Sequence, residues 1–299
     1  MDWISFTVKT LFSNPLFLAT YCVLILSILS FWVYKRIWLW PALLVAGLVL
    51  AFISKVIDTR ALLPIAILAL CHFGLHANIR GPLRTILVVL AGIMSFGLML
   101  HWLPGFNNWL IAKDMQVSPD SYPYTMYFNL DVPFIGIFVL GLNTQLLRFW
   151  AEWKGKLIPI GIWVGITITV MLLLSDAFKI VHFEPKFPAI TIPWLIKNLF
   201  LVCIPVEAFW RGFLQKELIE TFKDHSKWVP AYVIGGIAGA FAILHIFFVP
   251  HFSYLIMAFF AAVLYGSAYH FTKSIEAAIF AHFFLNVTQF FLFTYPALK

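Results

Sequence analysis

The sequence predicts an all-α membrane protein, a polytopic bundle of transmembrane helices, and three observations support this. Of its 299 residues, 62% are hydrophobic and only 11% are charged, whereas a soluble domain carries about 25% charged residues. The mean hydropathy is +0.93. Several tryptophans lie at the ends of apolar stretches, where indole rings favour the membrane interface; these are Trp38, Trp102, Trp194 and Trp228. Together these features exclude an ordinary soluble domain.

Apolar runs bounded by charged or turn residues predict about ten spans of roughly 17–25 residues each. The second and fifth runs are short enough to be tilted or re-entrant, so we expect about 8–10 spans. In chain order the expected spans are 15–34, 38–54, 61–79, 84–104, 133–149, 157–175, 191–210, 229–249, 252–271 and 275–296.

Two connecting segments are longer than the others. Segment 105–132 combines aromatic residues with Asn, Asp and two prolines. An ordinary interfacial loop is the preferred interpretation, and a cover over a site is the alternative. Segment 212–227 alternates apolar and charged side chains at helical spacing. This spacing predicts that the seventh span continues as a helix along the membrane interface.

The formal charge of +7 is spread over short loops and does not form a basic face. We therefore expect membrane lipids as partners and no nucleic acid. One set of loops is richer in Lys and Arg, which predicts that these loops are cytoplasmic and the N-terminus is outside. We expect a multi-pass protein of the cell membrane, specifically a bacterial inner membrane; the oligomeric state stays open. The basic set is Lys35, Arg36, Arg80, Arg84, Arg148, Lys154, Lys156, Lys216, Lys223, Lys227 and Lys273.

Three short polar groups interrupt the last hundred residues of this apolar chain. Glu207 and Arg211 lie four residues apart, His245 closes the sequence FAILH, and His282 and Asn286 bracket HFFLN. An ionisable residue at membrane depth costs a few kcal/mol, so it usually has a partner and a function. Taken singly, a stabilising ion pair, a core histidine and interhelical hydrogen bonds explain these groups. Their joint presence on three spans predicts an active site.

The three groups resemble the motifs of the CPBP intramembrane proteases, also called CAAX proteases and bacteriocin-processing enzymes or the Abi family. That family carries EExxxR, usually continuing as FRGFL, then FxxxH, then HxxxN or HxxxD. Here the matching sequences are VEAFWRGFLQ, FAILH and HFFLN. The resemblance places a catalytic helical core at 191–299, whereas residues 1–190 form N-terminal transmembrane helices without an assigned motif.

The resemblance implies peptide-bond hydrolysis inside the membrane, with a peptide or lipidated protein as substrate. A glutamate of the first motif and His245 would activate a water. His282 and Asn286 would stabilise the oxyanion, and Arg211 would orient the glutamate. Family members are described as metallo- or glutamic endopeptidases. Two histidines and Glu207 could also ligate zinc, so the cofactor stays open between none and Zn.

One position departs from the family pattern. With Arg211 aligned, the first glutamate falls on Val206, and the retained Glu207 matches the second. Three explanations remain open. A local helix distortion such as a π-bulge rotates Glu207 toward the histidines, another acid from segment 105–132 replaces the missing one, or the chain binds membrane peptides without cutting them. A transporter with a charged substrate path is a further alternative, weakened by the absence of inverted repeats.

Other polar residues within the spans are interpreted as structural. His72 and His76 share a helical face beside Cys71, but no second ligand pair accompanies them, so packing is preferred. Lys197 is expected to snorkel or to line a water-filled cavity. The three cysteines show neither a disulfide framework nor a metal-binding spacing.

Overall fold

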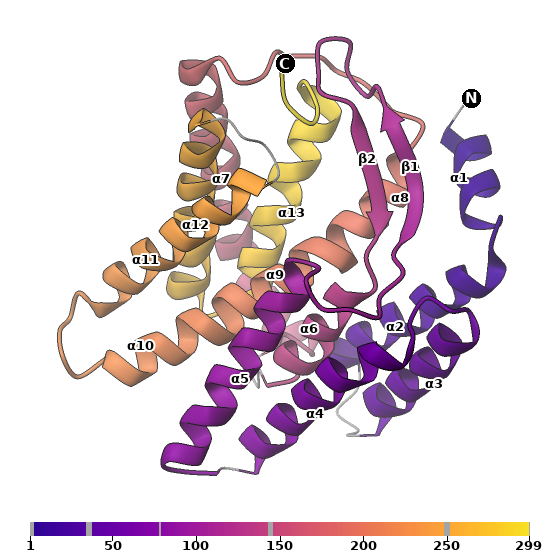
Figure 1. Ribbon diagram of the computed structural model, residues 1–299. Helices are drawn as coiled ribbons and strands as arrows, with labels where there is room; N and C mark the ends of the chain where they lie inside the picture. Colours follow the sequence, from indigo (N-terminus) through magenta and orange to yellow (C-terminus); the bar gives the residue numbers. More distant parts are fainter. Residues whose placement is uncertain (1–2, 34–37, 78, 143–145, 248–251, 299) are drawn as a thin grey trace. The chain divides into compact units, whose positions relative to one another are not determined.

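The computed structural model describes residues 3–33, 38–77, 79–142, 146–247 and 252–298, and it is mostly helical (Figure 1). Lys35 and Arg36 of the basic loops, and the end of the expected span 229–249, lie outside these residues. The chain forms two compact units, each built from distant segments. Unit 1 comprises Met1–Ala112, Met126–Arg148 and Ala189–Phe213; unit 2 comprises Lys113–Thr125, Phe149–Pro188 and Leu214–Lys299.

Among the described residues, 7 helical stretches are long and apolar enough to cross a membrane. Three shorter apolar helices accompany them: Leu39–Ile53, Asp131–Leu140 and Val229–Leu244. Long and short helices together coincide with the ten expected runs, so the predicted class of multi-pass helical membrane protein is confirmed. The long stretches are Pro15–Val33, Thr59–His76, Pro82–Met99, Trp150–Phe178, Thr191–Phe222, Phe252–Thr272 and Ile275–Leu292.

Unit 1 is organised around the short helix α6 (Asp131–Leu140), in which every residue is buried. Such an all-round apolar helix is expected at the centre of a bundle. It packs against α2, α4, α5 and α9 of the same unit. A Cβ at Gly136 would lie 3.4 Å from Ile28 of α2, which is an ordinary van der Waals distance. The helices of unit 1 are α1 (Trp3–Leu11), α2 (Pro15–Val33), α3 (Leu39–Ile53), α4 (Leu62–His76), α5 (Pro82–Met99), α6, α8 (Thr191–Ile196) and α9 (Ile204–Glu207).

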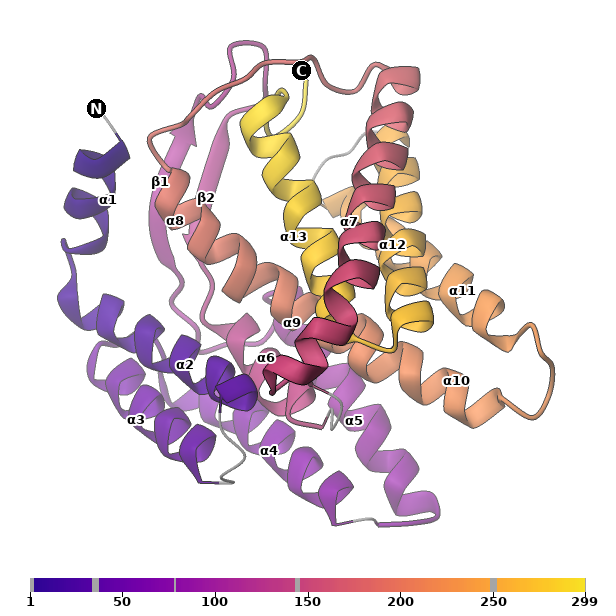
Figure 2. The ribbon, with the colours of Figure 1, turned by 180° about the vertical axis from the view of Figure 1, so that it is seen from behind.

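Unit 2 is a bundle in which α12 (Phe252–Thr272) packs against α7 (Trp150–Phe178), α11 (Val229–Leu244) and α13 (Ile275–Leu292). Figure 2 shows α7, α12 and α13 side by side from behind. Alanines at the contacts, such as Ala261, Ala278 and Ala281, belong to a buried cluster with Met171 and Tyr265. Small residues at such contacts let membrane helices approach closely.

Segment 105–132 has more regular structure than the interfacial loop that the sequence predicts, while the mostly helical fold class is as predicted. It contains strands β1 (Trp109–Met115) and β2 (Tyr124–Phe128), which form a two-stranded sheet. Aromatic and β-branched residues such as Tyr124, Thr125 and Phe128 favour strands. Trp109 and Phe128 of these strands are buried, whereas Tyr122 and Tyr127 are exposed.

The seventh span does continue as a helix, as predicted, through α10 (Lys216–Phe222). The residue just before α10 is anchored within unit 2, because the buried Gln215 Nε2 donates a hydrogen bond of 3.0 Å to the Gly266 carbonyl of α12. Gly266 has no side chain to obstruct this approach: a Cβ there would come within 2.9 Å of Gln215 Oε1. The start of α10 is therefore fixed to α12.

Candidate active site

The helical run from Thr191 to Phe222 is distorted around Glu207. Residues Lys197–Cys203 and Ala208–Gln215 are π-helical, and only the short α9 (Ile204–Glu207) separates them. π-helical turns are rare and occur frequently at functional sites. The distortion that the sequence analysis offered as one explanation for Val206 is therefore present. Its proposed effect, a rotation of Glu207 toward the histidines, stays a prediction.

Glu207 and Arg211 form an ion pair inside unit 1. Arg211 Nη1 lies 3.1 Å from Glu207 Oε2 and 3.2 Å from Oε1. Both side chains are 0% exposed. Their i,i+4 spacing with the glutamate first is the orientation that favours such a pair. In a dry interior each charge stabilises the other, and removing one partner leaves a buried charge behind.

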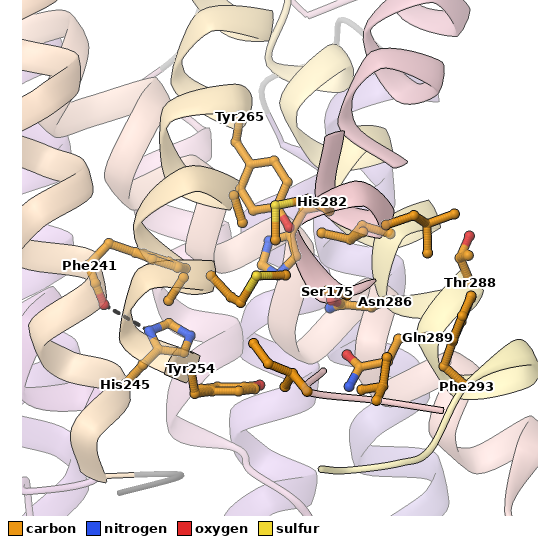
Figure 3. Close-up of a pocket in the computed structure, with 18 residues that line it drawn as sticks. Ser175, Phe241, His245, Tyr254, Tyr265, His282, Asn286, Thr288, Gln289 and Phe293 are labelled. Atoms are coloured by element: carbon orange, nitrogen blue, oxygen red, sulfur yellow. Dashed lines mark hydrogen bonds between the residues drawn. The ribbon is translucent and has the colours of Figure 1, made fainter. Parts of the chain in front are cut away.

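The other three predicted site residues line one cavity inside unit 2 (Figure 3). His245 comes from the end of α11, while His282 and Asn286 come from successive turns of α13. The cavity has a volume of about 110 Å³ and is otherwise walled mainly by apolar side chains. Its lining residues are Met171, Leu172, Ser175, Ile180, Val181, Phe241, His245, Tyr254, Met257, Ala258, Ala261, Tyr265, His282, Leu285, Asn286, Thr288, Gln289 and Phe293.

The imidazole of His245 is held by the helix end that carries it. Because α11 ends at Leu244, the backbone N–H of His245 turns to the carbonyls of Ala242 and Ile243. The Phe241 carbonyl thereby becomes one of the last-turn acceptors that need another donor. His245 Nδ1 donates a hydrogen bond of 2.7 Å to this carbonyl. The centroids of the Phe241 and His245 rings lie 4.4 Å apart. This geometry explains why the spacing FxxxH orients a histidine.

That hydrogen bond also sets the tautomer of His245. A carbonyl oxygen only accepts hydrogen bonds, so Nδ1 carries the proton. In a neutral imidazole Nε2 then has a lone pair that can take a proton from a water. The sequence motif therefore supplies a proton acceptor in a fixed orientation.

His282 is oriented by a residue that the sequence analysis missed. Its side chain is buried at 7% exposure, and its ring stacks on Tyr265 of α12 with centroids 4.7 Å apart and planes 16° apart. Tyr254 and Tyr265 lie on one face of α12, and both line the cavity. Two tyrosines three helical turns apart within a span were a signal that could have marked this face.

The pair His72 and His76 of α4 behaves as a packing group. His72 is buried, its Nδ1 lies 2.8 Å from the Phe138 carbonyl, and its ring stacks on His76 at 4.6 Å. The preferred interpretation of this pair as structural is thereby supported. Within each unit, the described residues contain no group of three or more His, Cys, Asp or Glu side chains arranged to hold a metal ion.

The fold and these side chains define a class: a multi-pass helical membrane protein with a cavity lined by two histidines and an asparagine. Residues 188–288 match the family described as Type II CAAX prenyl endopeptidase Rce1-like, which is a CPBP family, and this part of the chain is a domain of that family. The matched segment contains the ion pair and the three cavity residues. No curated protein and no solved structure matched the chain.

Proposed function

We propose that this chain is an intramembrane endopeptidase that hydrolyses peptide bonds of membrane-associated or lipidated proteins. The observation that carries the proposal is that His245, His282 and Asn286, from two separate motifs, line one cavity in unit 2. The family description names a CAAX prenyl endopeptidase, which makes prenylated proteins the first candidate substrates. An apolar cavity with a few polar groups suits such a ligand.

In the proposed mechanism His245 takes a proton from the attacking water. The Nδ1–H bond to the Phe241 carbonyl leaves Nε2 as the acceptor, and the water oxygen adds to the carbonyl carbon of the scissile bond. The proton then passes from Nε2 to the leaving amine as the carbon–nitrogen bond breaks. A positioned acid–base group of this kind contributes about 10²–10⁴-fold to the rate.

His282 and Asn286 are proposed to stabilise the oxyanion that forms on the carbonyl oxygen. Both side chains carry N–H donors, and their i,i+4 spacing on α13 places them on one face. The stack on Tyr265 limits rotation of the His282 ring. Donors that are held before the reaction stabilise a developing negative charge without reorganising.

Glu207 is proposed to activate the water together with His245, the role that the family resemblance gives it. Glu207 is the carboxylate that the family resemblance supplies, and an acid from segment 105–132 is the alternative. The cofactor stays open between none and Zn: His245 and His282, both on the cavity of unit 2, would supply two of the ligands that a zinc ion needs to activate water. Inhibition by 1,10-phenanthroline that added Zn²⁺ reverses would indicate the ion, and insensitivity would indicate the carboxylate alone.

A second candidate function is binding of membrane peptides or lipidated termini without cleavage. Two observations favour it. Val206 stands where the family has its first glutamate, and both oxygens of Glu207 lie within 3.2 Å of Arg211 Nη1. A carboxylate in a buried ion pair is committed to its partner, because leaving the pair would strand a buried charge.

The experiment that tests the proposal compares cleavage of a panel of prenylated and unmodified membrane peptides in liposomes. We expect His245→Gln to lower the rate of cleavage by about 10²–10⁴-fold. The matched control is His270→Gln, which removes a partly buried histidine of α12 that does not line the cavity. Equal activity of His245→Gln and the wild type would refute the mechanism, and no cleavage by the wild type of any peptide would favour the binding function.

A further inference from the structure

Part of the cavity wall lies outside the segment that matches the family. Ile180 and Val181 come from the strap, which we define as residues 179–188 between α7 and α8. Phe293 comes from the tail, defined as residues 293–298 after α13. All three line the cavity, whereas the family match covers residues 188–288. Ile180 and Val181 precede that segment, and Phe293 follows it. The strap and the tail both belong to unit 2.

The strap holds the end of α13 and the tail by a ladder of backbone hydrogen bonds. The last-turn carbonyls of Leu292 and Phe291 accept from the N–H groups of Glu184 and Lys186, each at 2.8 Å. Further along, the N–H of Thr294 donates to the His182 carbonyl at 2.9 Å. Helix-end carbonyls need partners of this kind, and here the strap supplies them.

The hairpin tip secures the tail from another direction within unit 2. The N–H of Tyr122 donates to the Ala297 carbonyl at 3.1 Å, and the N–H of Tyr295 donates to Ser118 Oγ at 3.0 Å. The backbone of the tail is therefore bonded to two separate segments. Such a backbone has little freedom to move when a ligand enters the cavity.

Phe293 itself is fixed at both its carbonyl and its ring. Its carbonyl accepts a hydrogen bond from Lys186 Nζ, and the Lys186 side chain is only 12% exposed. Its ring packs edge-on against Phe183, with centroids 5.6 Å apart. Burial lowers the pKa of Lys186, against the opposing effect of Glu184.

We propose that Phe293 is a specificity-determining residue, whose ring limits the size of the apolar side chain that a bound peptide inserts into the cavity. The reaction itself rests on the proposed function, but the size limit concerns binding and is measured separately. Figure 3 shows Phe293 on the cavity beside Gln289 and Thr288. In a cavity of about 110 Å³, a phenyl ring on the wall takes up space that a large group would need.

The size of the expected effect follows from how apolar pockets discriminate. One methylene group too many or too few changes the preference by about 10–200-fold when the wall is rigid. A wall that yields would discriminate less, because it would move aside for the larger group. The anchored carbonyl and the ring contact of Phe293 therefore favour strong discrimination.

The experiment uses photo-crosslinking, which does not depend on cleavage. Membrane peptides of one sequence carry a benzophenone group and differ only in one apolar side chain: alanine, leucine or phenylalanine. We expect Phe293→Ala to raise labelling by the phenylalanine peptide, relative to the alanine peptide, by at least about 10-fold. Phe293→Leu, which keeps more of the apolar contact, should shift the ratio in the same direction by less.

Three further variants separate an effect of the Phe293 ring from general loosening of unit 2. Phe291→Ala removes a ring that packs on Phe187 at 5.5 Å but does not line the cavity, so its labelling ratio should equal that of the wild type. Lys186→Met releases the Phe293 carbonyl and should weaken size selection, while Lys186→Arg should restore it.

Cleavage assays on the same proteins keep the two proposals apart. A shifted labelling ratio without cleavage by any protein supports size selection by Phe293 and counts against the proposed endopeptidase function. Cleavage with the same size preference in the wild type and Phe293→Ala contradicts size selection by Phe293 and supports the endopeptidase function. Absence of labelling by every peptide also contradicts size selection by Phe293.

Discussion

The two polar groups of the matched segment differ in what surrounds them. Glu207 and Arg211 have no exposed surface and neutralise each other. The imidazole of His245 donates to a backbone carbonyl and that of His282 stacks on a tyrosine ring, and both line a cavity. The first group is enclosed by protein, while the second is oriented toward a space that a ligand can enter.

This difference teaches that an ionisable residue in a membrane span does not by itself identify a catalytic group. A buried ion pair must be satisfied for the bundle to fold, so its removal should first cost stability. A histidine on a cavity contributes less to packing, so its removal should first cost activity. Mutations that separate stability from activity therefore test which role each group has.

The largest effect is expected for Glu207→Gln, which preserves the shape of the side chain but removes the negative charge beside Arg211. We expect a loss of about 3–5 kcal/mol in the free energy of unfolding, because a buried charge loses its partner. Thermal unfolding in detergent, followed by tryptophan fluorescence, measures it. Glu207→Gln combined with Arg211→Met should recover much of the stability but not the cleavage.

The control for this prediction is Glu220→Gln. Glu220 and Lys223 form a pair in the same helical run, but their side chains are 69% and 53% exposed, so the change should hardly alter stability. If Glu207→Gln were as stable as the wild type, the comparison of an enclosed group with an open one would fail. If the double variant regained cleavage, Glu207 would have a purely structural role.

A smaller effect is expected for Val206→Glu, which restores the family pattern. We expect cleavage to stay level or to fall, because a second carboxylate beside Glu207 adds repulsion and a desolvation cost. Its pH optimum should also move. The measurement is the rate of peptide cleavage as a function of pH. A clear gain of cleavage from an inactive parent would instead show that the chain had lost its base at this position.

The smallest effect is expected at an exposed pair of unit 1. Arg60 lowers the pKa of Asp58 through hydrogen bonds from its side chain and its backbone N–H. A carboxyl group with a lowered pKa in the folded state stabilises the fold above its unfolded pKa. That contribution disappears as the pH falls through the folded pKa. Asp58→Asn should therefore melt slightly below the wild type at neutral pH, and the two melting temperatures should converge in acid.

Local patterns predicted much of this molecule. Each of the ten apolar runs contains a helix, because hydrophobicity and length alone determine which segments suit a bilayer. The i,i+4 spacings predicted that Glu207 pairs with Arg211 and that His282 shares a face of α13 with Asn286. Such relations need no knowledge of the rest of the chain.

Features that depend on distant segments were missed. The hairpin of β1 and β2 was not predicted. Its strands pair through backbone hydrogen bonds, and a hydrophobicity pattern does not reveal such pairing. A distortion around Glu207 was one of three open explanations for Val206, and side-chain patterns could not decide for it because they do not reveal backbone bonding. Tyr265 and Phe293 reach the cavity because α12 packs on α13 and the strap binds the tail, and the second of these contacts joins residues more than a hundred positions apart.

The reactivity of Lys186, whose side chain is 12% exposed, can report on how often the strap beside the cavity opens. Its lowered pKa means that more of its amine is uncharged at a given pH, and uncharged amines react with acylating reagents. Because the side chain is shielded, reaction requires the strap to open locally. The acylation rate of Lys186, compared with that of the exposed Lys179 on the same strap, would therefore measure how often the wall opens.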